Sequence, residues 1–236
     1  MKNKTSKGLM MVGSVRSAGV TTYMKQGQLI MRSSRSMEKR SNTLGQFVQR
    51  MRMRHSVALW GMLKICEPMF TERPTAYRNF LSLANRLQPV YVNRRTMSYA
   101  SFLMPGIPVS DGKLQPIGEQ LGEVDGTPAL ITNLGPCAHS RKAKLWLFTA
   151  VQYTDGTPSV SFSRRDVPWQ ELTLVDGHYA LTGEEFADPM KGWALVLVDS
   201  DRCTPQGIVT CCSLYQQYTT DEALQAAAKS YGGITK

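Results

Sequence analysis

The sequence predicts an α+β protein: a basic N-terminal arm with a β-hairpin, then a helical pair, then an all-β sandwich. Three observations lead to this prediction. Residues 1–95 hold 18 Lys and Arg against three acids, whereas residues 96–236 hold 10 against 15. Apolar residues recur at helical spacing, every three or four positions, between residues 43 and 95. Beyond residue 96 they follow the two-residue period of strands.

The composition is that of an ordinary folded chain. Of 236 residues, 42% are hydrophobic and 19% are charged, which excludes collagenous and wholly disordered classes. No run of 18 apolar residues occurs, so we expect no membrane span. The apolar stretch Leu9 to Val12 is shorter than a signal-peptide core, and the five cysteines have no regular spacing. We therefore expect a cytoplasmic protein that is free of disulfides.

Residues 1–42 form the basic arm, with seven Lys and Arg before the first acid, Glu38. Within it, two apolar runs at 20–25 and 28–33 flank Gln26-Gly27, the pattern of a β-hairpin. A lone hairpin is marginally stable in water. We expect the arm to be ordered only against a partner or against another part of the protein.

Residues 43–95 predict two helices. Thr43 and Gln46 match a capping box at the start of the first, and Pro68 stops it. The second helix begins near Pro74-Thr75 and ends before Pro89, since proline suits the first turn of a helix. A short connection, Glu67–Arg73, makes the pair antiparallel. The apolar stripe of the first helix comprises Leu44, Phe47, Val48, Met51, His55, Ala58, Leu59, Met62 and Cys66.

Residues 96–220 predict a β-sandwich of immunoglobulin-like type. Short apolar runs with few helical signals between them are separated by Asp-Gly turns at 125–126, 155–156 and 176–177 and by Gln206-Gly207. We expect residues 100–220 to fold alone, and residues 221–236 to form a short helix and tail. The expected strands lie at 127–134, 144–153, 159–163, 171–175, 178–181, 193–198 and 208–215.

Several short motifs resemble an uncharacterised family of Bacteroidota proteins. They are Gly13-Ser-Val15, Arg32-Ser33, the Thr43-x-x-Gln46-x-x-x-Arg50 helix start and the Leu-Val-Asp-Gly turn at 174–177. The family combines a Gly-rich basic lead, a Thr-x-x-Gln capped helix and a C-terminal immunoglobulin-like sandwich. This chain departs from it in having no Trp in the lead. The resemblance implies an architecture and no mechanism.

Candidate catalytic and metal-binding residues are few. His55 lies on the apolar stripe, where a packed histidine is the expected state. Cys137-Ala-His139 is the nearest approach to a nucleophile with a base. The sequence contains no Cys-x-x-Cys and no glycine-rich nucleotide motif. We therefore expect a non-enzymatic protein with no metal and no cofactor.

The strongest functional signal is the basic charge. Such a cluster neutralises nucleic-acid phosphates or binds acidic protein surfaces, and a solvated surface with no partner is the remaining alternative. The candidate residues are Lys2, Lys4, Lys7, Arg16, Lys25, Arg32, Arg35, Lys39, Arg40, Arg50, Arg52 and Arg54.

The sequence thus predicts a structural or assembly component, of the kind found in a phage or mobile-element particle. Its basic arm would dock on copies of itself, on other assembly subunits or on nucleic acid. The alternative is a stand-alone protein that binds nucleic acid without sequence specificity, because no base-reading module is present. Neither alternative involves a membrane.

Overall fold

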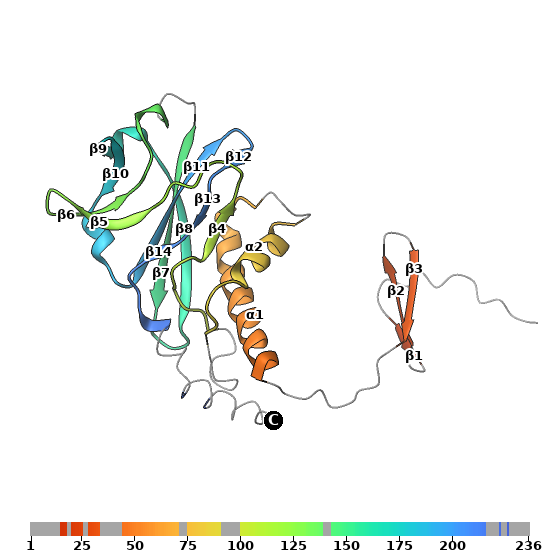
Figure 1. Cartoon of the computed structure of the whole chain (residues 1–236). Helices are drawn as coiled ribbons and strands as arrows, with labels where there is room; N and C mark the ends of the chain where they lie inside the picture. The colour runs from red at the N-terminus through yellow and green to blue at the C-terminus, as the bar shows by residue number, and fades with distance from the viewer. Residues whose placement is uncertain are drawn as a thin grey trace, which may run out of the picture. The chain divides into compact units, whose positions relative to one another are not determined.

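The computed structural model describes residues 15–17, 20–25, 28–33, 44–70, 75–90, 100–138 and 143–215, with positions 222 and 226. The chain divides into two compact units, Met1–Ser41 and Asn42–Lys236, and each is described by itself (Figure 1). Within these ranges, no helix combines the length and the apolar character that crossing a membrane requires. Apart from positions 222 and 226, the predicted C-terminal helix lies outside the described residues.

The N-terminal unit contains a three-stranded antiparallel sheet. Strand β1 (Val15–Ser17) pairs with β2 (Val20–Lys25), which pairs with β3 (Gln28–Ser33). The predicted hairpin is confirmed, and its two strands begin and end at the predicted residues, 20–25 and 28–33. Strand β1 was not predicted, although the glycine of Ala18-Gly19, directly before β2, was the available signal in the sequence.

The second unit begins with the predicted helices. Helix α1 (Leu44–Leu63) continues into a 3-10 turn, η1 (Lys64–Cys66), before Pro68. Helix α2 (Ala76–Ala84) starts where expected, because the Thr75 hydroxyl accepts a 3.3 Å hydrogen bond from the amide of Arg78. Thr43 and residues 71–74 lie outside the described residues.

The strands of the second unit form two sheets and a ribbon, and every pairing between named strands is antiparallel. The four-stranded sheet has the order β5 (Gln120–Val124), β6 (Thr127–Ile131), β10 (His178–Thr182), β9 (Leu172–Val175). The five-stranded sheet has the order β12 (Arg202–Cys203), β11 (Lys191–Asp199), β7 (Lys144–Tyr153), β8 (Ser159–Val167), and β14 (Val209–Thr210) also pairs with β11. Strands β4 (Pro108–Asp111) and β13 (Pro205–Gly207) form the ribbon. Short 3-10 turns occur at η2 (Pro136–Ala138), η3 (Trp169–Glu171) and η4 (Glu184–Ala187).

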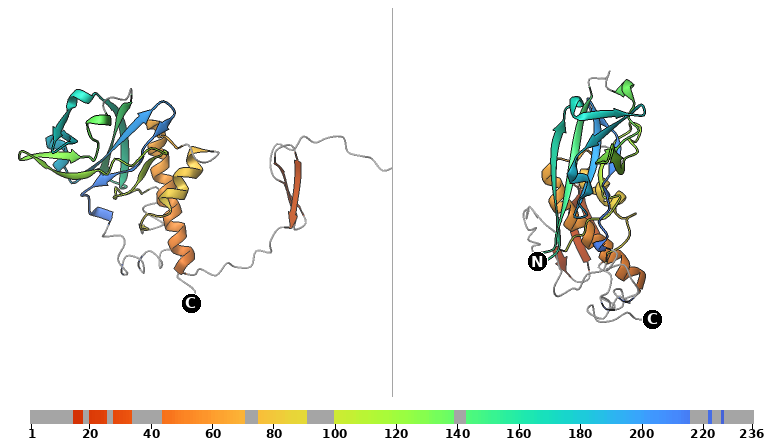
Figure 2. Two further views of the ribbon diagram at one scale, coloured as in Figure 1. Left: turned by 45° about the horizontal axis from the view of Figure 1, so that its top comes forward. Right: turned by 90° about the vertical axis from the view of Figure 1, so that its left-hand side faces the viewer.

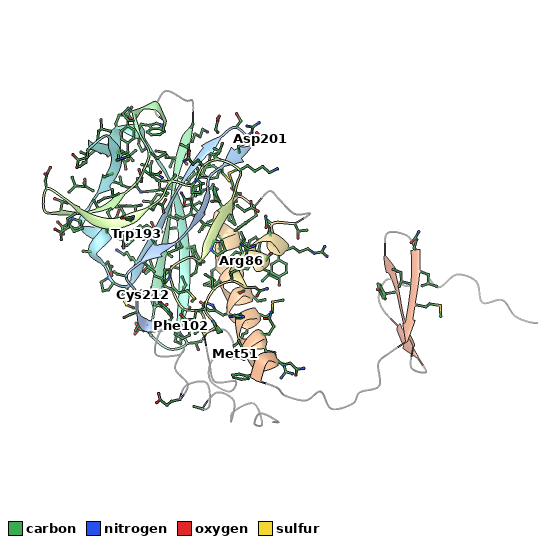
Figure 3. All side chains as sticks on the ribbon, in the orientation of Figure 1. Met51, Arg86, Phe102, Trp193, Asp201 and Cys212 are labelled. Carbon is green, nitrogen blue, oxygen red and sulfur yellow. The ribbon has the colours of Figure 1, made fainter. Side chains whose placement is uncertain are left out.

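The five-stranded sheet is the middle of three layers, with α1 and α2 on one side and the four-stranded sheet on the other (Figures 1 and 2). Strand β11 shows why. Trp193, Leu195 and Leu197 enter the core shared with the four-stranded sheet, and the alternate residues 194, 196 and 198 enter the core shared with the helices. Figure 3 shows Trp193 on the side of the four-stranded sheet and Phe102 nearer the helices. The α+β class is therefore confirmed, and the helices and the sheets share a core.

Turn chemistry was predicted well at two hairpins and wrongly at a third position. Asp125-Gly126 and Asp176-Gly177 have positive φ at both residues, as tight hairpin turns require. Gln206-Gly207 is not a turn, because both residues lie in β13 opposite β4, with a register shift between them. The glycine is needed there for close packing, since a Cβ on Gly207 would lie 3.1 Å from the backbone of Gly106. The predicted closing strand at 208–215 is also shorter, and spans only Val209–Thr210.

Candidate interaction surface

Strand register gives the N-terminal sheet two chemically different faces. Arg16 lies opposite Thr21, and Thr21 lies opposite Arg32, so these three residues form one row across the sheet. Because side chains alternate along a strand, each face is determined by this register. The basic face carries Arg16, Thr21, Tyr23, Lys25, Gln28, Ile30 and Arg32. The apolar face carries Val15, Ser17, Val20, Thr22, Met24, Leu29, Met31 and Ser33.

The apolar face exposes large side chains. Leu29 is 58% exposed and Met31 is 64% exposed, and both lie on β3, two positions apart. Their neighbours across the strand pair are Met24 and Thr22. Burying one such side chain is worth about 1.5–3 kcal/mol. An exposed apolar face on so small a sheet has the character of a docking surface.

On the basic face, the structure describes the side chains of Tyr23, Gln28 and Ile30. Tyr23 lies opposite Ile30, and both are half-buried. The Arg16–Thr21–Arg32 row lies on one side of this pair, and Lys25 lies on the other. The side chains of Arg16, Lys25 and Arg32 lie outside the described residues, and so do the remaining arm candidates: Lys2, Lys4, Lys7, Arg35, Lys39 and Arg40.

The three candidate arginines of α1 do not gather in one patch. Arg50 is exposed, whereas Arg52 and Arg54 are half-buried. At about 100° per residue, Arg50 and Arg54 share one flank of the buried stripe, and Arg52 lies on the opposite flank. The Nε of Arg52 is buried, with no hydrogen-bond partner among the described residues. The helix therefore presents at most a pair of cations on one side.

His55 is a packed residue of the core. Its Nε2 lies 3.0 Å from the amide nitrogen of Phe102 and 3.1 Å from the carbonyl oxygen of the same residue. Burial lowers the pKa of His55 to about 4, against the opposing effect of the hydrogen bond with the Phe102 backbone. The ring is neutral at pH 7 and connects α1 to the segment before β4.

The described cysteines are free thiols. Cys66, Cys203 and Cys212 are buried, and burial raises the pKa of all three. Cys211 is exposed and, like Cys212, follows β14 rather than lying on a strand. His139 and the side chain of Cys137 lie outside the described residues. In the ranges that the structure describes, no three His, Cys, Asp or Glu side chains are placed to hold a metal ion.

A cleft of about 440 Å³ lies between α2 and the β4–β13 ribbon, and sequence patterns did not predict it. Leu83, Leu87 and Pro108 supply apolar walls, and Arg86 and Asp111 supply charge. The Ser110 hydroxyl donates to the Thr204 carbonyl at 2.7 Å and accepts from the amide of Gln206 at 3.1 Å. This hydroxyl is therefore engaged in holding the ribbon together.

No protein-family model, curated protein or solved structure matches the chain. The two-faced N-terminal sheet is the feature with the clearest chemical consequence.

Proposed function

We propose that the protein is a non-enzymatic structural or assembly component that docks the apolar face of its N-terminal sheet on a neighbouring subunit. A phage or mobile-element particle is the kind of assembly that needs such an arm. The observation that carries the proposal is the exposure of Leu29 and Met31 on one face of a three-stranded sheet. The unit Met1–Ser41 has the size, about 40 residues, at which a chain rarely buries enough apolar surface to be stable without packing on a further surface.

A second copy of the chain is the partner that we propose. Residues 1–95 carry a large excess of cations, and residues 96–236 carry an excess of acids. The arm of one subunit and the sheets of the next are therefore complementary in charge, which steers association. Exposed acids lie at both ends of the four-stranded sheet: Glu123, Asp125, Glu184 and Glu185 at one end, and Asp176 at the other.

The stacked sheets are proposed to be an immunoglobulin-like sandwich that serves as the body of the subunit. Support comes from strand order. The sequence β5-β6-β10-β9 opposite β12-β11-β7-β8 follows the order of the A, B, E, D and G, F, C, C′ strands of immunoglobulin domains. The departure is that α1 and α2 cover the outer face of the second sheet.

Docking is tested by removing the apolar side chains from the exposed face. We expect the full chain to self-associate with increasing concentration in light scattering coupled to size-exclusion chromatography. Replacement of Leu29 and Met31 by Ser should shift it to monomer. A matched control replaces Tyr153 and Leu174, each 51% exposed on the second unit, by Ser. A wild-type chain that stays monomeric at all concentrations, or a control that dissociates equally, would contradict the proposal.

A further inference from the structure

We infer that strand β3 of one copy of the chain pairs with strand β8 of another copy and thereby extends the five-stranded sheet of its neighbour. The inference rests on the proposed function, which supplies an arm that docks on a second copy, and it names the surface that receives this arm. Strand β8 forms one edge of the five-stranded sheet, and β3 forms one edge of the N-terminal sheet. Edge strands carry backbone groups that a further strand can satisfy.

Hydrogen bonds with Ser101 show which backbone groups of β8 point away from β7. The amide of Ser101 donates to the Pro158 carbonyl at 3.0 Å, and the amide of Val160 donates to the Ser101 hydroxyl at 2.9 Å. Because successive residues of a strand direct their backbone groups to opposite sides, residues 162, 164 and 166 also point outward. The described part of the chain provides no backbone partner for these three residues on that side. This edge of β8 can therefore accept a further strand.

Strand β3 matches this edge in length. It spans six residues and, among the described residues, pairs with β2 alone. Alternate residues of β3 therefore direct their backbone groups away from β2, which makes three of the six. Strand β1, at the other edge of the N-terminal sheet, spans only three residues. Of the two edge strands of the arm, β3 is thus the one whose outward backbone matches the three outward residues of β8.

An exposed apolar side chain lies close to the β8 edge. Helix α1 contacts β8 (Figure 1), and the carboxylate of Glu67 lies 3.3 Å from the guanidinium of Arg164 on β8. This contact places the end of η1 beside the strand. Ile65, two residues before Glu67, is 74% exposed, more than any other large apolar side chain that the structure describes. With the apolar face of the arm turned toward the helices, Leu29 and Met31 would cover Ile65 and exclude water from it.

The charges at the β8 edge also favour the arm. Arg164 pairs with Glu67 at 3.3 Å, and Arg165 pairs with Glu171 at 2.7 Å. Asp166, the next residue, is exposed and forms no ion pair within the ranges that the structure describes. The N-terminal unit contains nine Lys and Arg against one acid. The pairing therefore brings a cationic arm to an edge whose unmatched charge is negative.

A proline substitution tests the edge without adding charge. Arg164→Pro removes one outward N–H of β8, and an edge strand tolerates proline where the N–H does not face the neighbouring strand. Arg164→Gln is the matched control, because it loses the same charge and keeps the amide. In light scattering coupled to size-exclusion chromatography, Arg164→Pro should raise the dissociation constant of self-association about tenfold. Arg164→Gln should stay within about twofold of wild type.

The next outward residue supplies a second, independent pair of variants. Asp166→Pro should weaken self-association as Arg164→Pro does, and Asp166→Asn is its control. Thermal melting by circular dichroism shows which variants are folded. If Arg164→Pro does not fold, the comparison at position 166 decides. Proline variants that fold and associate as strongly as their controls would overturn the inference.

Mixing two defective variants tests whether the two unlike surfaces meet. The variant with Ser at positions 29 and 31 has a damaged arm and an intact β8 edge, whereas Arg164→Pro has an intact arm and a damaged edge. Each alone should be monomeric at a concentration where the wild type associates. Their equimolar mixture should form a dimer and no larger species, because it contains a single intact arm-to-edge contact. A mixture that stays monomeric would overturn the inference.

Failure of the inference and failure of the proposed function give different results. If the Ser variant of Leu29 and Met31 remains associated, the docking proposal is wrong and the inference falls with it. If that variant is monomeric while the proline variants associate like their controls, the docking proposal stands and the inference is wrong, because the arm then docks elsewhere on the second copy.

Discussion

His55 and Phe102 are 47 positions apart in the chain, and the histidine ring contacts both polar groups of the Phe102 backbone. Nε2 of His55 lies 3.0 Å from the amide nitrogen and 3.1 Å from the carbonyl oxygen. His55 is 5% exposed and Phe102 is 2% exposed. This connection holds the segment before β4 against α1 in the interior of the second unit.

The contact predicts a loss of stability in acid. The pKa of His55 is about 4 in the folded protein and 6.5 in an unfolded chain. The contribution of His55 to the free energy of unfolding is fully present above pH 6.5. It is lost as the pH falls from 6.5 toward 4, because the unfolded chain then binds a proton that the folded protein excludes. The loss over this window is about 3 kcal/mol. Urea unfolding at pH 7.5, 6, 5 and 4.5 measures it.

His55→Gln supplies the control, since its amide can replace the ring in hydrogen bonding and does not titrate. The difference in unfolding free energy between wild type and this variant should shrink as the pH falls. A difference that is the same at every pH would show that His55 does not lower stability in acid.

Glu119 predicts a pH dependence of opposite sign. One carboxyl oxygen accepts a hydrogen bond from the amide of Leu195, in the part of the β11 edge between β12 and β14. The other oxygen is buried, with no partner among the described residues. Burial raises the pKa of Glu119 well above its ordinary value, and the hydrogen bond from Leu195 opposes this. The contribution of Glu119 to the free energy of unfolding is therefore present below about pH 4.5. It is lost as the pH rises through the pKa of this carboxyl group in the folded protein.

Glu119→Gln keeps an oxygen acceptor for the Leu195 amide and removes the titrating group. We expect the stability of this variant relative to wild type to rise between pH 4.5 and pH 8, as measured by urea unfolding. A relative stability that falls over this range would contradict the assignment of a protonated, buried carboxyl group.

Gly112 predicts a large effect of adding a single methyl group. A Cβ at this position would overlap the Cys203 carbonyl oxygen, so the β4 end and β12 would have to separate. Gly112→Ala should lower the free energy of unfolding by about 3 kcal/mol. Gly61→Ala is the matched control in α1, where a Cβ meets nothing within 4 Å, and should stabilise by about 0.5–1 kcal/mol. Thermal melting of both variants checks the contrast, and a Gly112→Ala protein as stable as wild type would refute it.

The sequence predicts that residues 100–220 fold alone, whereas the core that α1 and α2 share with the middle sheet leads us to expect that they do not. Without α1 and α2, the face of the middle sheet that carries Phe148, Ala194 and Val196 would be open to water. We expect residues 100–215 expressed alone to melt without a cooperative transition, while the full chain melts cooperatively by circular dichroism. A cooperative, native-like melt of the fragment would show that the helices are dispensable.

Local patterns predicted the elements whose residues carry their own signal. The hairpin at 20–25 and 28–33 follows from two apolar runs around Gln26-Gly27, and β7 follows from the long alternating run at 144–153. Pro74-Thr75 predicted the start of α2, since proline suits the first turn of a helix. The structure adds that the Thr75 hydroxyl accepts a hydrogen bond from a backbone amide of that turn. These signals span only a few residues, so they can be read without knowledge of what packs against them.

Long-range packing decided the rest. The continuous apolar run at 193–198 was identified as a strand, but only the tertiary structure shows that its alternate side chains enter two different cores. Strand β13 was predicted to be a turn because a pair that contains glycine, such as Gln206-Gly207, is typical of turns. In the structure, Gly207 instead lies in a strand and permits close contact with Gly106. The exposed pair Leu29 and Met31 was missed for the same reason, because the exposure of a side chain depends on its neighbours in space.

The sequence by itself determined the α+β class, the positions of most strands and the concentration of positive charge near the N-terminus. The tertiary structure decided which faces are buried and which remain open, since that depends on contacts between residues far apart in the chain.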